Sequence, residues 1–288
     1  MSELHENKLK FLEEMANKIR QDIIEMLVEA KSGHSAGPLG MADIFTALYF
    51  HVLNHNPKNP GWADRDRVVV SNGHICPVLY ATLANAGYFP MEELFTLRKI
   101  NSHLQGHPHR NSLPGLETTS GPLGSGISQS IGMALAARLD SRKNRIYCLT
   151  SDGEHQEGNT WEAVMFAGKQ KSKLNNLTVI MDRNNIQIDG FTEEVMPLEP
   201  LRQKYEAFNW HVLEVDGHDI HQFVSAVNEA KAIYEKPTVI IAHTIPGKGV
   251  SFMENRFEWH GKPPNAEEAK VALAELRTLE GRIKSEHE

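Results

Sequence analysis

Apolar side chains recur at three- and four-residue steps between residues 8 and 31, which is the stripe of an amphipathic helix. The stripe consists of Phe11, Leu12, Met15, Ile19, Ile23, Met26, Leu27 and Ala30. Ser32 and Gly33 interrupt the pattern, and a loop of small residues over 34–40 leads to a second predicted helix over 41–52. We therefore expect an N-terminal helical arm at about residues 1–31.

Short apolar runs rich in β-branched residues alternate with helical patterns along the rest of the chain. The predicted strands cover 67–71, 145–150, 177–181, 211–215 and 238–244. The predicted helices cover 77–86, 90–99, 127–139, 160–171, 201–208, 220–234 and 266–283. This alternation predicts βαβ units, and hence a three-layer α/β/α fold with a mostly parallel sheet. We expect a single domain, 1–288, with a C-terminal linker and helix at about 245–288.

Residues 101–126 follow neither period and are rich in Gly, His, Pro, Ser and Thr. An irregular segment of this length within a compact domain is usually either functional or disordered. Because the segment leads directly into the predicted helix over 127–139, we favour the functional interpretation.

The composition narrows the class of protein. The formal net charge of −7 argues against a nucleic-acid partner, since phosphate backbones select basic faces. The two cysteines, Cys76 and Cys148, stand in apolar surroundings, which favours a reducing compartment over a disulfide framework. No apolar run reaches the roughly 18 residues of a membrane span. We expect a cytoplasmic protein that binds neither nucleic acid nor membrane.

Two polar turns at strand ends carry the candidate metal chemistry. Asp152 and Gly153 follow the predicted strand over 145–150, and Asn184 follows the next strand along the chain. The carboxyl ends of parallel strands meet at one edge of a sheet, where helix N-termini also present free N–H groups to anions. Magnesium prefers hard oxygen ligands and shares them with phosphate. The spacing therefore predicts a site for a magnesium-bound diphosphate.

Four histidines lie in loops marked by Gly or Pro, namely His34, His74, His107 and His260. The predicted sheet can bring these loops to the face that carries the strand-end Asp and Asn. Histidine donates or accepts hydrogen bonds near neutral pH, which suits a diphosphate and sugar hydroxyls. Any one of them alone is more simply a solvated loop residue, so the prediction depends on the group.

Other ligand motifs are disfavoured. Gly-Ser-Gly at 124–126 lacks the third glycine of a dinucleotide fingerprint and does not follow a strand, and Gly-Lys-Gly at 247–249 lacks the Ser or Thr of a P-loop. His103, His107 and His109 are close in sequence, but Pro108 restricts their loop and no Cys or acidic ligand joins them. A nicotinamide dehydrogenase therefore remains only a distant alternative.

A set of ordered motifs resembles the N-terminal, diphosphate-binding part of transketolase. The set comprises Ser-Gly-His-x-x-x-Pro-Leu-Gly at 32–40, Ser-Asn-Gly-His at 71–74, Gly-His-Pro at 106–108, Gly-Pro-Leu-Gly-x-Gly at 121–126, Asp-Gly-Glu-x-x-Glu-Gly at 152–158, Asp-x-Asn-x-Ile-x-Ile-Asp-Gly at 182–190 and Trp-His-Gly at 259–261. Each is weak alone, but together they are specific. The resemblance implies the thiamine diphosphate-binding (PP-domain) fold.

The resemblance also implies a cofactor site. Magnesium, or another divalent cation such as Ca²⁺ or Mn²⁺, would be held by Asp152, Asn184 and the Ile186 carbonyl. The phosphates of thiamine diphosphate would be bound by the Gly153 N–H, His74 and His260. The path of the cofactor would be lined by Gly121 and Leu123.

The same resemblance assigns the remaining site residues. His34 and His107, with His260, would contact the reacting sugar, and Glu157 would lie at a subunit contact near the cofactor. Ser35 replaces a proline that is common in the family, and Ser151 replaces a glycine. We expect both replacements to be harmless, provided that φ of Ser151 is negative.

Length is the main departure, because single-chain transketolases are roughly twice as long, a common scale for further domains. The resemblance then implies the N-terminal subunit of a split transketolase, which acts on sugars or sugar phosphates with a second chain carrying the pyrimidine and C-terminal domains. We expect a heterotetramer. The alternatives are a deoxyxylulose phosphate synthase-like or dihydroxyacetone synthase-like subunit, or a non-catalytic regulatory homologue.

Overall fold

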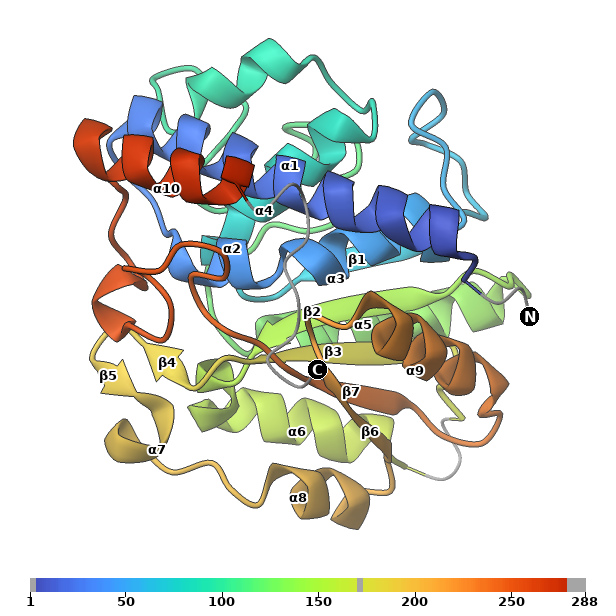
Figure 1. Ribbon diagram of the computed structural model, residues 1–288. Coiled ribbons are helices and arrows are strands. Elements are labelled where there is room, and N and C mark those ends of the chain that lie inside the picture. The colour runs from blue at the N-terminus through green and yellow to red at the C-terminus, as the bar shows by residue number, and fades with distance from the viewer. Residues whose placement is uncertain (1–3, 170–172, 279–288) are drawn as a thin grey trace.

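A five-stranded parallel sheet forms the centre of the molecule (Figure 1). The computed structural model describes residues 4–169 and 173–278. The strands lie in the order β1-β2-β3-β7-β6, and every neighbouring pair is parallel. Their bounds are β1 Arg67–Val70, β2 Ile146–Ser151, β3 Leu177–Arg183, β6 His211–Asp216 and β7 Thr238–His243. The predicted parallel α/β sheet is confirmed.

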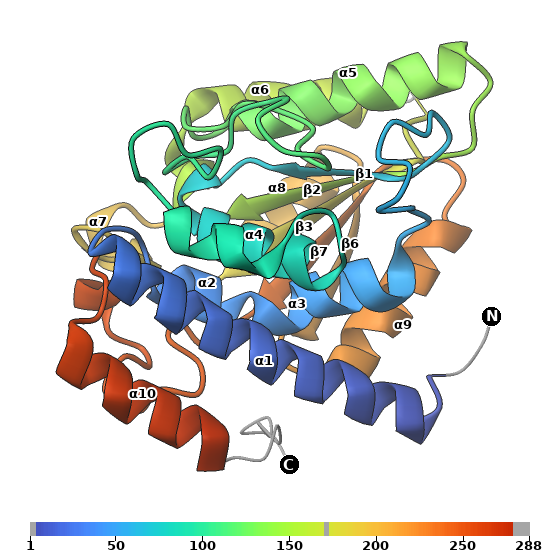
Figure 2. The same cartoon turned by 90° about the horizontal axis from the view of Figure 1, so that it is seen from above.

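Helices cover both faces of this sheet (Figure 2). One layer contains α1 Glu6–Ala30, α2 Ala36–Gly40, α3 Ala42–Ala47, α4 Cys76–Asn85, α9 Ile220–Ala232 and α10 Ala266–Thr278. The other contains α5 Ser125–Leu139, α6 Gly158–Ala167 and α8 Leu201–Ala207. Successive strand residues alternate between two buried clusters: Val68 and Val70 pack in one, and Val69 in the other. The strands are therefore buried on both faces, as parallel sheets require.

The helical arm ends where its sequence predicts. Lys31 adopts a left-handed φ of 51°, and its N–H donates to the Leu27 carbonyl at 2.9 Å. Gly33 has a φ of +132°, and a Cβ at this position would lie 2.5 Å from the Leu27 side chain. Glycine is required here by both backbone conformation and space. The turn directs the next residue, His34, toward the carboxyl ends of the strands.

Several predicted bounds are wrong in detail. The small-residue loop over 34–40 is largely helical, because α2 occupies Ala36–Gly40, and the helix predicted over 41–52 is divided into α3 and a π-helical turn, Leu48–Val52. The segment over 90–99 forms only a 3₁₀ helix, Met91–Thr96. The helices predicted over 160–171 and 266–283 are described to Ala167 and Thr278, and positions 171 and 283 lie outside the described residues.

Three short elements were not predicted: the hairpin strands β4 Ile186–Gln187 and β5 Gly190–Phe191, and helix α7 Thr192–Val195. Two-residue strands carry no readable period, so only tertiary contacts define them. They lie beside the carboxyl end of β3. Among the described residues, no helix combines the length and the apolar character that crossing a bilayer requires.

Candidate active site

Asp152 follows β2 directly, and its carboxylate is fully buried. Its Oδ1 accepts the Gly153 N–H at 2.7 Å, while its Oδ2 accepts the Asn185 N–H at 2.7 Å and Arg183 Nη1 at 3.0 Å. Burial raises the pKa of Asp152, and the neighbouring Arg183 guanidinium opposes that rise. Oδ1, which accepts one hydrogen bond, retains a lone pair for a metal ion, whereas Oδ2 already accepts two.

Asn184 follows β3 and is held by two side chains behind it. Its Nδ2 donates to Asp182 Oδ2 at 2.8 Å, and Thr244 Oγ1 donates to Asp182 Oδ1 at 2.5 Å. The Asn184 Oδ1 accepts the Ile186 N–H at 3.0 Å. Because Asp182 accepts the amide N–H, the orientation of the Asn184 amide is determined. Asp182 belongs to the strand rather than to the turn after it, and burial raises its pKa to about 7.

Three of the four predicted histidines form a triangle. The ring centroid of His34 lies 5.0 Å from that of His74 and 5.4 Å from that of His260, and His74 and His260 are also 5.0 Å apart. Burial lowers the pKa of all three, that of His34 to about 3. The triangle is therefore uncharged at neutral pH and presents imidazole groups that can each donate and accept.

Ser35 explains why His260 lies beside His34. The buried Ser35 hydroxyl contacts the Lys262 carbonyl at 2.6 Å and the Trp259 carbonyl at 3.2 Å, on either side of His260. A proline at this position has no hydroxyl to make these contacts. The residue that departs from the family pattern thus positions a histidine of the site.

His107 lies on a separate, well-anchored loop and remains exposed. The Tyr80 hydroxyl donates to the Gln105 carbonyl at 2.8 Å, and Cys76 Sγ donates to the Gly106 carbonyl at 3.2 Å. Arg98 joins this loop to the first one, because its Nη1 donates to Ser32 Oγ at 2.9 Å and its Nη2 donates to the Gly106 carbonyl at 3.4 Å. The pKa of His107 is lowered by burial and by the Arg98 charge.

The remaining predicted residues surround this group with different degrees of exposure. Gly121 has a φ of +145° and open space where a Cβ would lie, and the side chain of Leu123 is 37% exposed. Glu157 is exposed at the N-cap of α6, and its side chain makes no cap hydrogen bond. Gly153 and the β4 residue Gln187 are adjacent, since a Cβ on Gly153 would lie 3.7 Å from Gln187 Oε1.

Several buried polar atoms around the site have no hydrogen-bond partner within the described part of the chain. They are His34 Nδ1, Asn72 Oδ1 and Nδ2, Ser120 Oγ, Gln187 Oε1 and His260 Nδ1. Buried polar groups are normally paired, so this set fits a polar ligand that supplies the missing partners. Over residues 4–169 and 173–278, no three His, Cys, Asp or Glu side chains form a metal-holding group. A ligand set with a single carboxylate, an amide oxygen and a carbonyl therefore suits Mg²⁺ better than zinc.

The sequence-based prediction assigned no role to Arg183, Asp182 or Arg98, and it treated Ser35 only as a harmless replacement. Arg183 and Asp182 stand inside the Asp-x-Asn motif, so their proximity to Asn184 was visible in the sequence. Their contacts with Asp152 and Thr244 were not, because those partners come from other strands.

A family model described as "Transketolase, thiamine diphosphate binding domain" matches residues 12–278. The chain belongs to the transketolase family. It is 44% identical over 265 residues to the 6-deoxy-6-sulfo-D-fructose transketolase subunit SqwG of Clostridium sp. (strain MSTE9), and the match covers 92% of this chain and 96% of the relative. The resemblance and the fold predicted from the sequence motifs are thereby confirmed.

Further relatives differ in how much of their own length the chain matches. An apulose-4-phosphate transketolase subunit of Phocaeicola vulgatus is 41% identical, with 93% of this chain and 95% of the relative covered. Transketolase 1 of Escherichia coli (strain K12) is 40% identical, and the match covers 90% of this chain and 40% of the relative. The solved transketolase from Leishmania mexicana superposes with a TM-score of 0.88 at 37% identity, covering 94% of this chain and 41% of that one.

Proposed function

We propose that this chain is the thiamine diphosphate-binding subunit of a two-chain transketolase, which transfers a two-carbon glycolaldehyde unit from a ketose to an aldose. The relatives matched over 96% and 95% of their length are named as transketolase subunits. The observation that carries the proposal is the His34, His74 and His260 triangle, in which two Nδ1 atoms have no partner among the described residues. The alternatives of a related thiamine enzyme or a regulatory homologue are not favoured.

The cofactor-binding roles follow from the family resemblance, and the His260 Nδ1 is the atom among them that is buried without a partner in the described part of the chain. Asp152, the Asn184 amide oxygen and the Ile186 carbonyl would hold Mg²⁺, or Ca²⁺ or Mn²⁺ in its place. His74 and His260 would donate to the phosphates, and Gly121 and Leu123 would line the remaining path. The Gly153 N–H donates to Asp152 Oδ1 at 2.7 Å, so a phosphate at this position must share or replace that bond.

The histidines would handle the sugar in their neutral form. When bound, thiamine diphosphate supplies the carbon that carries the two-carbon unit between sugars. His34 and His107 each offer one N–H donor to a carbonyl or hydroxyl oxygen, and His260 can exchange a proton with a neighbouring hydroxyl. Donors already oriented by the Ser35 and Arg98 contacts need little reorganisation as charge develops on the sugar oxygen.

The partner would be a second chain that carries the pyrimidine and C-terminal domains. Glu157, exposed at the start of α6, would lie at the contact between chains, and the complete enzyme would be a heterotetramer. We expect this enzyme in the cytoplasm. Two relatives are named for a sulfonated and a phosphorylated sugar, so the donor substrate is also expected to be a sugar that carries an anionic group.

The decisive experiment mixes this chain with a candidate partner chain in the presence of Mg²⁺ and thiamine diphosphate. Ketol transfer is assayed with 6-deoxy-6-sulfo-D-fructose, with phosphorylated ketoses and with unmodified ketoses. Activity is expected only from the mixture, and transfer by this chain alone would refute the two-chain proposal.

A matched pair of variants tests the metal assignment. Asp152→Ala is expected to abolish cofactor binding, measured by calorimetry, while the far-ultraviolet circular dichroism remains that of a folded chain. Asp140→Ala removes an exposed carboxylate and should bind as the wild type does. Unchanged affinity in Asp152→Ala would exclude this residue as a metal ligand.

A further inference from the structure

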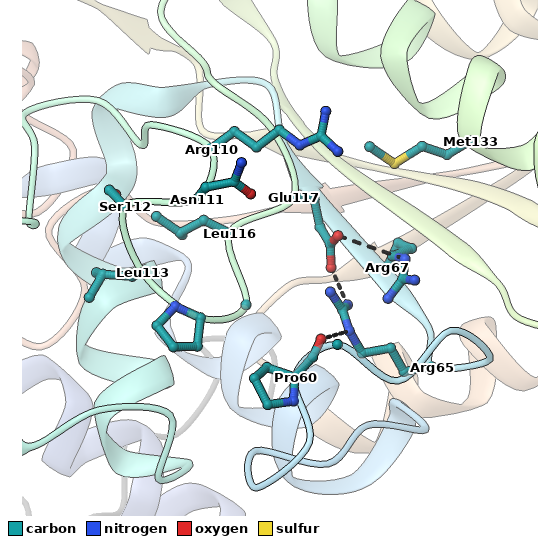
Figure 3. Close-up of a pocket in the computed structure, with 13 residues that line it drawn as sticks. Pro60, Arg65, Arg67, Arg110, Asn111, Ser112, Leu113, Leu116, Glu117 and Met133 are labelled. Carbon is teal, nitrogen blue, oxygen red and sulfur yellow. Dashed lines mark hydrogen bonds and ion pairs between the residues drawn. The ribbon is translucent and has the colours of Figure 1, made fainter.

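Figure 3 shows a cavity of about 610 Å³. It lies at the opposite end of β1 from the histidine triangle. Arg67, the first residue of β1, lines it, whereas His74 follows the carboxyl end of that strand. The polar lining consists of Arg65, Arg67, Arg110, Asn111, Ser112 and Glu117. None of these residues belongs to the active site described above.

The cavity carries more positive than negative charge. Glu117 is its one acidic side chain, 9% exposed, and it is paired with Arg65 and lies 3.7 Å from Arg67 Nε. In Figure 3, Glu117 lies between these two arginines, and Arg110 extends across the opposite side of the opening. With three arginines around one carboxylate, two positive charges are not balanced by the lining.

Several donors of the lining are also unsatisfied. The Arg110 guanidinium makes no hydrogen bond or ion pair with the described residues, and the buried Ser112 Oγ has no partner among them. Burial lowers the pKa of Arg67. The charges of Glu117 and Asp66 oppose that shift, and the like charges of Arg65 and Arg142 add to it. A bound anion would satisfy the donors and relieve the repulsion between the arginines.

The rest of the lining includes apolar side chains that are packed into the core. Leu113 and Leu116 are buried in the main core, so the loop that carries Arg110 and Ser112 is packed rather than free. With Met133 they provide a surface for a carbon skeleton, and the volume exceeds that of a lone phosphate group.

We propose that this cavity binds a phosphoryl dianion, either free phosphate or the phosphomonoester of a small metabolite. The site is separate from the cofactor site and adds an anion-binding function to the transketolase chain. Arg110 is its principal free donor, and Arg67 and Ser112 complete the contact. The proposal does not depend on the function proposed above.

The test is calorimetric titration of the whole chain, at about 0.15 M salt, with inorganic phosphate and with glycerol 3-phosphate. Arg110→Gln is expected to weaken binding by about ten-fold, since a charge-assisted, bidentate contact is lost. Lys58→Gln is the control, because Lys58 is an exposed residue on the loop that carries Pro60 but does not line the cavity. This variant should change the affinity for phosphate by less than about two-fold. His74→Ala should leave this binding unchanged.

Two results would overturn the proposal. The first is equal phosphate affinity in the wild type and in Arg110→Gln, which includes the case that neither shows saturable binding. The second is phosphate binding that is lost in His74→Ala but retained in Arg110→Gln. The second result would place the anion at the cofactor site. If the Arg110 dependence holds, tighter binding of glycerol 3-phosphate identifies a phosphomonoester site, and equal or tighter binding of phosphate identifies a site for the free ion.

Discussion

At the scale of the residue, Arg183 is the most informative side chain, because it compensates the buried charge of the proposed metal ligand. It is 4% exposed and lies 3.0 Å from Asp152 Oδ2 through Nη1. Its Nη2 lies 2.7 Å from Glu193 and 3.0 Å from Glu199, both of which are more exposed. The guanidinium thus connects Asp152 to two surface carboxylates.

Replacing Arg183 with Met should therefore make the fold more dependent on metal. Breaking a buried pair leaves one charge uncompensated, so the metal-free variant should lose about 3 kcal/mol of unfolding free energy. Mg²⁺ with thiamine diphosphate should then raise the melting temperature more in the variant than in the wild type, as measured by calorimetric scans. Arg202→Met, at an exposed arginine, is the control. Equal cofactor-induced shifts in Arg183→Met and wild type would contradict this role.

At the scale of the element, a buried network joins α1, α3 and the loop after β6. Arg20 Nη2 of α1 lies 2.5 Å from Asp43 Oδ2 of α3, and His218 Nδ1 lies 2.8 Å from the same oxygen. The Ile245 N–H donates to His218 Nε2 at 2.7 Å, which extends the network to the C-terminal linker. This linker leads to His260, so the network fixes the start of the segment that carries a histidine of the site.

Asp43→Ala is expected to lower the free energy of unfolding by about 3–5 kcal/mol, measured by denaturant titration, because it leaves Arg20 buried without its partner. Asp140→Ala, at a surface pair, should cost about 1 kcal/mol or less. Burial alone raises the pKa of Asp43, but Arg20 and His218 outweigh it and lower the pKa to about 2.

The direction of the pH effect follows from that lowered pKa. The unfolded chain takes up a proton on Asp43 near pH 3.8 and the folded chain near pH 2, so the stabilisation is present above pH 3.8 and lost as the pH falls toward 2. Asp43→Asn should lose less stability than the wild type over this interval. If the unfolding free energies of the two proteins fell equally between pH 3.8 and pH 2, the network would not control the loss of stability in acid.

At the scale of the whole molecule, α6, whose N-cap is Glu157, exposes two apolar side chains near its C-terminal end. Met165 is 58% exposed and Phe166 is 51% exposed, two turns along the helix from its N-cap. Large apolar side chains that remain exposed next to each other are typical of surfaces that another chain covers. We therefore expect α6 to contribute to the contact with the partner chain.

Phe166→Glu should weaken association with that partner by about 30-fold, or about 2 kcal/mol, since an apolar anchor is replaced by a charge. Sedimentation velocity of the mixture measures this change. Tyr234→Glu alters a side chain that is 75% exposed, beyond the end of α9 and away from α6, and should associate normally. Equal weakening by both variants, or by neither, would remove α6 from the proposed interface.

The local pattern alone determined the helical arm, the parallel sheet and the strand ends that carry Asp152 and Asn184. Hydrophobic periodicity and turn residues are local properties, and parallel strands bring their carboxyl ends to one edge whatever the details of packing. The ordered motifs added the family. The predicted bounds are wrong where the sequence has no clear period. These places are the two-residue strands β4 and β5 and the helix predicted over 41–52, which is divided in two.

The tertiary structure alone decided the partners of those residues. The Ser35 contacts with the segment around His260, the Arg183 pairing with Asp152 and the Thr244 support of Asp182 join residues that lie on different loops and strands. No local pattern encodes such contacts, because they depend on the order of strands and on side-chain packing between layers. For the same reason the arginine-lined cavity could not be predicted from the sequence, since its lining comes from three separate segments of the chain.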